Sequence, residues 1–305
     1  MTFSAGSFHG LRYVTEASYG VTPSTPAMID LRHKACTLGI TKDTFQSEEV
    51  RTDRQIADFR HGALKVTGGF DFEFSYSEYD TILESALFGA WNTNVLKAGV
   101  TAKSFTMERA YADITKYSVF TGCEATTFSL SVPSNNIVTG SFAFVGKSAG
   151  AMTGTPLDAS TTASQTNSPF DSFTGTIEEG GSAIATVTGI ELTLENSIDP
   201  AFVIGSNVAA AVTPGRSNLT GTVSAWFDSD TLFNKFVNET ESSLEFTLGN
   251  GTTKSYTFLI PRLKYSGGGD INVSGEGRIA LSMPFQALRA TSEATQLQIT
   301  RIPGA

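Results

Sequence analysis

Residues 65–88 predict a strand that runs directly into a short helix. Between 66 and 74, apolar side chains recur at nearly every second position, which is typical of a strand with one buried face. Between 79 and 87 they follow at helical spacing. Ser77 and Asp80 form an S-x-x-D pattern, which predicts that Ser77 caps this helix.

The same strand and helix return late in the chain, over residues 218–237. The Thr-Gly pair at 67–68 matches the pair at 220–221, an offset of 153 residues (220 − 67). At that offset Ser77 falls on Asp230, which is an equally good residue to cap a helix. Further strands follow in the same order in each half. This agreement predicts an internal duplication, with chance similarity between β-rich segments as the alternative.

The remaining segments predict antiparallel strands and little helix. Alternating or apolar segments in the first half lie at 28–40, 105–107, 117–124, 128–132 and 137–145, and in the second half at 184–194, 201–212, 244–248, 278–285 and 297–302. Turns are expected at 132–136 and 267–270. The expected core or sheet-packing positions are Phe70, Phe72, Phe74, Ile82, Leu83, Trp226, Phe227 and Phe236.

The predicted fold class is mainly β, with two tandem antiparallel β-sandwich or barrel units that each carry one short flanking α-helix. The first domain is expected at residues 1–148 and the second at 183–305. Residues 149–182 are rich in Gly, Ser and Thr and are expected to form a linker or extended loop. Each unit alone would have long sheet edges, and unpaired edges are templates for another chain. The pattern therefore points towards assembly.

Composition narrows the class of protein. The chain has 305 residues, of which 40% are hydrophobic and 17% charged, and no apolar run is long enough to span a membrane. Its first residues lack the basic-then-apolar layout of a signal peptide, so folding in a cytoplasm is expected. In that compartment Cys36 and Cys123 are expected to be reduced.

The charge distribution argues against binding to nucleic acid. The net charge is −9, whereas phosphate contacts need clustered Lys and Arg. Residues 148–214 contain no Lys, Arg or His but hold seven acids: Asp158, Asp171, Glu178, Glu179, Glu191, Glu195 and Asp199. This segment is either a solvated acidic linker and sheet edge, or a surface that repels a polyanion.

A search for catalytic or metal-binding residues finds no candidate. His33 and Cys36 are the one His/Cys pair at ligand spacing, and on an alternating strand they would face opposite sides. No nucleophile elbow, P-loop, metalloprotease or dinucleotide-binding motif is present. We therefore predict a protein that is not an enzyme and needs no cofactor or metal.

Residues 41–62 carry acids and bases in close alternation. The segment is expected to form either a surface helix or a long projecting loop. Mixed charges on a projection suit a contact between copies, as against a merely solvated face. The expected contact residues are Glu48, Glu49, Arg51, Asp53, Arg54, Asp58 and Arg60.

Three segments in order resemble the major tail tube proteins of long-tailed bacteriophages, the siphophage type. They are Glu16-Ala-Ser-Tyr-Gly-Val-Thr-Pro23, the charged segment 44–62, and the strand and helix at 65–91. The resemblance implies a β-sandwich or barrel unit whose sheets join side by side in a ring of six, with rings stacked into a tube. With two units per chain, a homotrimeric ring with pseudo-sixfold symmetry is expected, and a homohexamer is the alternative.

The resemblance also implies the partners. These are other copies of the chain, the tail terminator and the tail tip proteins, with no membrane. The tape measure protein and DNA would pass through an acidic lumen without specific binding during ejection into the host. The expected location is the virion tail, after assembly in the host cytoplasm. The alternatives are a β-rich adhesion or carbohydrate-binding fibre, another phage structural module and, more remotely, a β-rich hydrolase.

Overall fold

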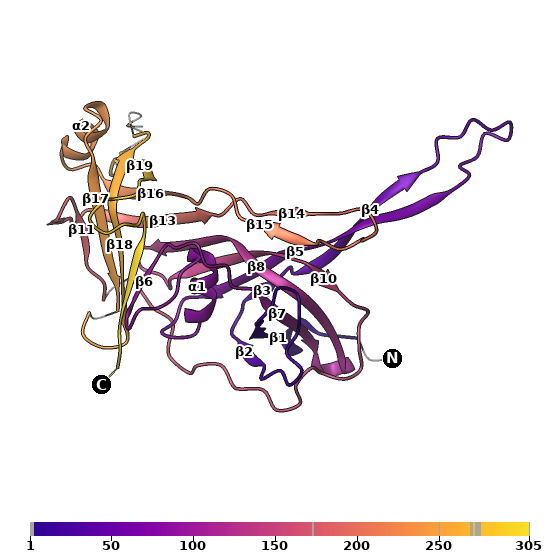
Figure 1. Cartoon of the computed structure of the whole chain (residues 1–305). Helices are drawn as coiled ribbons and strands as arrows, with labels where there is room; N and C mark the ends of the chain where they lie inside the picture. Colours follow the sequence, from indigo (N-terminus) through magenta and orange to yellow (C-terminus); the bar gives the residue numbers. More distant parts are fainter. Residues whose placement is uncertain (1–2, 173, 250, 269–270, 272–275, 305) are drawn as a thin grey trace.

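A computed structural model describes residues 3–172, 174–249, 251–268, 271 and 276–304, and shows a mainly β protein (Figure 1). The first half holds β1 (His9–Thr15), β2 (Ile29–Leu31), β3 (Ala35–Cys36), β4 (Gly39–Gln46), β5 (Phe59–Glu73), α1 (Asp80–Leu87), β6 (Val95–Lys97), β7 (Phe105–Tyr111), β8 (Lys116–Pro133), β9 (Thr139–Gly146) and β10 (Ser148–Ala149). The second half holds β11 (Ile177–Glu179), β12 (Ser182–Ala183), β13 (Val187–Glu195), β14 (Asp199–Ala201), β15 (Ala211–Thr213), β16 (Asn218–Trp226), α2 (Thr231–Val237), β17 (Ser242–Leu248), β18 (Ser255–Tyr265), β19 (Ala280–Ala287) and β20 (Gln298–Ile302).

One antiparallel sheet runs through both halves in the order β4–β5–β9–β8–β13–β16–β19. The two halves meet where β8 pairs with β13, with Leu130 opposite Leu192. A second junction forms where β6 of the first half pairs with β20, which in turn pairs with β18. Within the described residues, strand pairing therefore joins the halves at two separate places.

Strand pairing follows the same order in each half. In the first half β5 pairs with β9, β9 with β8 and β8 with β7. In the second half β16 pairs with β19, β19 with β18 and β18 with β17. Two further strands extend each set. In the first half β7 pairs with β1 and β1 with β2. In the second half β17 pairs with β11 and β11 with β12.

The hydrophobic core covers one face of the long sheet. Phe70, Phe142, Phe128 and Leu194 lie opposite one another on four successive strands and are each at most 3% exposed. Alternation places every second side chain of these strands on this face. The helix α1 packs on the same side, with Ile82 and other apolar side chains fully buried in the core.

The strand and helix at 65–88 are confirmed, but the predicted cap is wrong. The helix begins at Asp80, Tyr79 is the N-cap residue, and Ser77 lies in a left-handed turn with a φ of 65°. The backbone N–H of Ser77 donates instead to the phenol oxygen of Tyr256, at 3.0 Å. A contact from the second half, which local sequence does not contain, thus determines the conformation before the helix.

The core prediction is correct for the first half and partly wrong for the second. Phe70, Phe72, Phe74, Ile82 and Leu83 are buried, and Phe236 is partly buried. Trp226 and Phe227, however, are 38% and 36% exposed. They lie where β16 ends before α2, and the Arg278 guanidinium lies over the Trp226 ring, 5.6 Å from its centroid.

Several strand boundaries also differ from prediction. Residues 28–40 form parts of three strands, and the strands predicted at 117–124 and 128–132 are one strand, β8, with a bulge after Ala125. The turn at 132–136 is confirmed, whereas Gly269 and Asp270 of the other predicted turn lie outside the described residues. Cys36 and Cys123 are both free thiols.

Glycines in or directly beside the Thr-Gly pairs at 67–68 and 220–221 allow close contact between strands. A Cβ atom on Gly221 would lie 2.4 Å from the backbone oxygen of Glu191 in the neighbouring β13. On Gly69 it would lie 1.9 Å from the backbone oxygen of Phe142 in β9. Glycine is therefore required for strand pairing at these positions.

Candidate assembly surfaces

The face of the long sheet opposite the core is polar across six strands. One row across the sheet consists of Asp71, Ser141, Ser129, Thr193, Thr220 and Gln286, each opposite the next. The next row consists of Glu73, Thr139, Ser131, Glu191, Thr222 and Pro284. Small hydroxylated side chains and carboxylates predominate, so this face presents acceptors and negative charge without a large apolar group in these rows.

Four acids give this polar face its charge. Asp71, Glu191 and Glu195 are exposed and Glu73 is half-buried. Part of the face forms a depression of about 410 Å³, to which Lys34 contributes the one basic side chain. Of the seven acids in the segment without bases, two, Glu191 and Glu195, belong to this face, whereas Glu179 is buried and pairs with Lys235.

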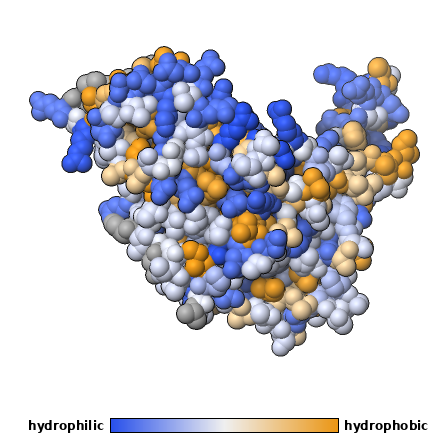
Figure 2. All heavy atoms as spheres, turned by 60° about the vertical axis from the view of Figure 1, so that its left-hand side comes forward, coloured by the Kyte–Doolittle hydropathy of each residue, from blue (hydrophilic) through white to orange (hydrophobic). Residues whose placement is uncertain are grey.

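The charged segment at 41–62 forms a long hairpin that projects from the body (Figure 1). We call residues 44–60 the arm. It contains β4 and β5 ends and a loop, so of the two expected forms it is a projection and not a helix. Figure 2 shows the projection at the upper right, where hydrophobic residues lie next to hydrophilic ones.

The arm charges are partly paired with one another. Arg51 binds Asp53 at 3.0 Å and Arg60 binds Asp58 at 2.9 Å. Among the residues that the structure describes, Glu48, Glu49 and Arg54 make no ion pair. These three charges are therefore available to a partner. The two pairs are exposed and join near neighbours, so they contribute little to stability and could also exchange for contacts with a partner.

Apolar side chains on the arm escaped the sequence prediction. They are exposed to solvent in the single chain: Phe45, Val50, Ile56 and Phe59. A second hairpin, β14–β15, lies beside the base of the arm (Figure 1), and its Asn207 carbonyl accepts a hydrogen bond from the Leu64 N–H at 2.7 Å. Ile204 near its tip is fully exposed. The sequence signal that could have predicted these exposed apolar side chains is the alternation of apolar and charged residues in 44–60.

The motif at 16–23 is organised by the buried carboxylate of Glu16. Its oxygens accept hydrogen bonds from the Gly20 and Gly122 N–H groups at 2.7 and 2.9 Å. They also accept hydrogen bonds from the hydroxyls of Ser104 and Thr106, at 2.7 and 2.8 Å. Four donors compensate this buried charge and tie the end of β1 to β7 and β8. The motif is therefore structural in the single chain.

Glu124 lies close to this carboxylate and differs from it. It is 4% exposed, and one of its oxygens, Oε2, is buried without a hydrogen-bond partner in the described part of the chain. Burial, together with the negative charge of Glu16, raises the pKa of Glu124 to about 7. The carboxyl thus takes up a proton more readily than an exposed glutamate.

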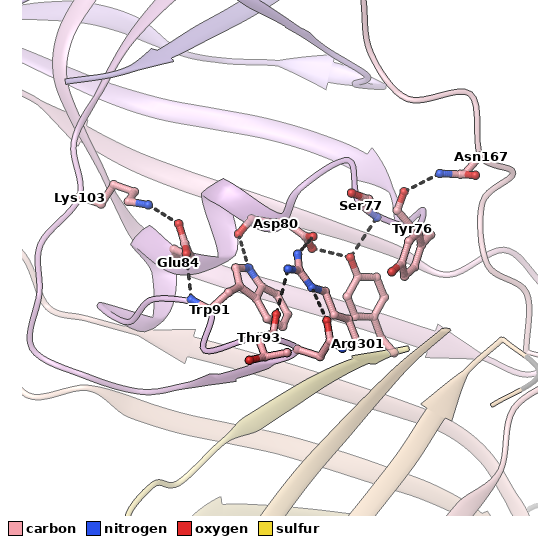
Figure 3. A network of polar contacts seen from close by, with 11 residues as sticks. Tyr76, Ser77, Asp80, Glu84, Trp91, Thr93, Lys103, Asn167 and Arg301 are labelled. Atoms are coloured by element: carbon pink, nitrogen blue, oxygen red, sulfur yellow. Dashed lines mark hydrogen bonds and ion pairs between the residues drawn. The ribbon is translucent and has the colours of Figure 1, made fainter. Parts of the chain in front are cut away.

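A polar network around α1 joins the two halves (Figure 3). The Asp80 carboxylate accepts a hydrogen bond from Arg301 Nη1 at 2.6 Å, and another from the Tyr256 hydroxyl. The Arg301 guanidinium also lies over the Trp91 ring, 4.6 Å from its centroid, and donates to the Thr93 carbonyl. Asp80 comes from the first half and Arg301 from β20, so the network fixes the internal interface.

His33, which the sequence places at ligand spacing from Cys36, contacts His9 in the structure. His33 accepts from or donates to His9 at 2.8 Å, and His9 accepts a hydrogen bond from Arg109 Nε at 3.0 Å. Burial and the Arg109 charge lower the pKa of His9 to about 4. Within the described residues no group of three or more His, Cys, Asp or Glu could hold a metal ion. None of the described helices is long and apolar enough to cross a membrane.

These features describe a mainly β protein with one polar sheet face and projecting hairpins. Comparison with known families identifies it further, because residues 6–287 match the model of the phage tail tube protein family. The chain therefore belongs to the phage tail tube protein family and is a structural protein of the virion tail. A search of curated proteins gives no match.

Proposed function

We propose that this protein polymerises as stacked rings into the tail tube, and that the polar face of the long sheet lines the channel for DNA. The observation that carries this proposal is the two polar rows across six strands of both halves. Exposed carboxylates repel the DNA phosphates, and the absence of clustered bases from these rows gives DNA nothing to hold. DNA could then move along the lumen without being retained.

The repeated strand order supports two units in each chain. We propose a first unit at residues 1–148, a connecting segment at 149–182 and a second unit at 183–305. Three chains would then fill the six positions of a ring, with β8–β13 pairing inside each chain serving as one lateral contact between units. A hexamer of chains remains the alternative outcome.

Contact between rings is assigned to the arm. Its unpaired charges, Glu48, Glu49 and Arg54, and its exposed apolar side chains would meet a neighbouring ring. The charges that are paired within the arm, Arg51 with Asp53 and Arg60 with Asp58, would contribute by orienting it. The proposed role needs no catalytic residue.

Electron microscopy of the concentrated protein tests the assembly. We expect hollow tubes whose end-on views show three chains per ring. Strict sixfold rings would keep the tube and contradict two units per chain. Protein that stays monomeric at every concentration would contradict self-assembly.

The lumen assignment has its own test in DNA co-sedimentation with tubes. Wild-type tubes should leave linear DNA in the supernatant at physiological salt. The double variant Glu191→Lys/Glu195→Lys should retain DNA, and retention should weaken steeply as salt is raised. The control is Glu178→Lys, an exposed acid on β11 outside the polar face. Equal retention by the control would show that the polar face is not the lumen.

A further inference from the structure

The two helices follow equivalent strands but have unequal surroundings. In α1, six of eight residues are buried, whereas in α2 Leu232 is the one buried residue among seven. The second half adds contacts at the start of α1, where Tyr256 of β18 and Arg301 of β20 both bind the Asp80 carboxylate. Within the described residues Lys235 of α2 instead binds Glu179 and Ser242, which belong to its own half.

The surface at α2 is partly exposed and mainly apolar, with the Arg278 guanidinium over its Trp226 ring. Val237 is 58% exposed, Trp226 is 38% exposed and Phe227 is 36% exposed, while Phe233 and Phe236 are partly exposed. These side chains come from the end of β16, from the residue that follows it and from α2. A cluster of this kind on a soluble surface marks an interaction site.

The first half carries a counterpart to the strands that cover α1. The cover consists of Tyr256, at the start of β18, and Arg301, which pairs with it in β20. In the first half Tyr117 lies at the start of β8 and pairs in the same way with Thr153. Next to Thr153, Met152 is 58% exposed.

We propose that the α2 surface (Trp226, Phe227, Phe233, Val237) docks against the segment around Tyr117, Met152 and Thr153 of a second copy of this chain. This contact between chains would correspond to the internal contact of Tyr256 and Arg301 with α1. It rests on the proposed ring assembly and names the lateral surfaces of that assembly. Because two different surfaces meet, the contact is head-to-tail and closes only if the rotation between copies closes a ring.

The intermolecular contact differs from the internal one in chemistry. At α1 the interface holds a partly buried ion pair between Asp80 and Arg301, and a strand pairing between β6 and β20. The connection from α2 to β17 spans residues 238–241, which leaves no room for a strand like β6. The second contact therefore depends on apolar burial, which suits chains that fold first and associate later.

Two single-surface variants test the contact in the full chain. Val237→Asp places a charge on the α2 surface, and Met152→Asp places one on the opposite surface. Both positions are exposed in the single chain, so each variant should fold, with an unchanged circular dichroism spectrum and melting temperature. Val100→Asp, at an exposed apolar residue in a loop outside both surfaces, is the matched control.

Each variant alone should fail to form tubes and should raise the concentration needed for association at least ten-fold, because a carboxylate would be buried in an apolar contact. An equimolar mixture of the two should instead give a discrete dimer in analytical ultracentrifugation. In that dimer the intact α2 surface of Met152→Asp meets the intact Met152 surface of Val237→Asp, and the remaining surfaces are blocked.

The outcomes separate this contact from the proposed function. Tubes from wild type, control and both variants alike would overturn the contact and leave the tail tube proposal standing. Monomeric variants whose mixture gives no dimer would also overturn the pairing of these two surfaces. If wild type and control were themselves monomeric at every concentration, the assembly and the contact would both be wrong.

Discussion

The helices α1 and α2 each follow a strand with the same order of pairing, but they make different polar contacts. Asp80 of α1 binds Arg301 and Tyr256 from the other half of the chain. Lys235 of α2 binds Glu179 at 2.5 Å, within its own half. The polar contacts of α1 thus hold the halves together, whereas those of α2 only hold the helix on its own sheet. Two helices that follow strands with the same pairing order therefore contribute differently to the stability of the chain.

The largest effect is expected from truncating the buried side of α1. Leu83 is fully buried, so Leu83→Ala should lower the free energy of unfolding by about 2–5 kcal/mol through lost burial and a cavity. Val237→Ala in α2 should change it by less than about 0.5 kcal/mol when measured at a concentration where the chains are monomeric. Urea unfolding followed by circular dichroism measures both. Similar losses from both variants would contradict the unequal burial of the helices.

The internal interface should be the next most sensitive place. Arg301→Ala removes the cation that pairs with Asp80. Of the two partners that the second half gives this buried carboxylate, only the Tyr256 hydroxyl would remain. We expect a loss of about 2–4 kcal/mol in the free energy of unfolding, because an incompletely compensated buried charge is costly.

A double-mutant cycle with Asp80→Asn identifies the source of that loss. If the ion pair is responsible, the second substitution should cost much less in the Arg301→Ala background than in the wild type. Fully additive losses would assign the effect to Arg301 stacking on Trp91 and not to the Asp80 contact.

Part of this arrangement could be read from the sequence. Alternating apolar residues located the strand before each helix, and the order of segments predicted the mainly β fold. The exposure of Trp226 and Phe227 could not be predicted, because both follow the same apolar pattern as buried residues. Periodicity shows which face of an element is apolar, but not whether another element packs on it. The cap was missed for a related reason, since the Ser77 N–H finds its partner in Tyr256, 179 residues away.

The assembly surfaces were predictable to different degrees. Mixed charge identified the arm, although it did not show that Arg51 and Asp53 would pair with each other. The polar face was not found, because its rows form only when β8 pairs with β13 across the two halves. Strand alternation gives two faces, and which of them is buried depends on this non-local pairing.

The halves also differ in buried charge, which gives a pH-dependent prediction. β8 holds the buried carboxyl of Glu124, whereas the corresponding strand β18 carries the half-buried Lys264. The folded-state pKa of Glu124 is raised to about 7 from 4.5, so the folded protein binds the proton more tightly than the unfolded chain. Its contribution to stability is therefore full below pH 4.5 and is lost as the pH rises through 7.

Glu124→Gln should remove this slope and stabilise the protein at pH 8 by about 1–3 kcal/mol relative to wild type. Melting temperatures between pH 4 and 8 measure the effect, with the exposed Glu191→Gln as a control that keeps the wild-type profile. The loss of stability below pH 6.5 should persist in both variants, because the lowered pKa of His9 makes the unfolded chain the tighter proton binder there. An unchanged slope in Glu124→Gln would show that another group titrates.

The smallest effect is expected at α2. Lys235→Met keeps the aliphatic stem but removes the ammonium group from Glu179, which retains hydrogen bonds from Ser242 at 2.6 Å and Tyr265 at 3.1 Å. Because two donors remain and Lys235 is partly exposed, the loss should be about 1 kcal/mol. This contact lies within the second half, so its loss should add to that of Arg301→Ala within about 0.5 kcal/mol. A larger coupling energy in urea unfolding of the double variant would mean that α2 and the internal interface unfold as one unit. The two helices would then differ in exposure but not in their contribution to the contact between the halves.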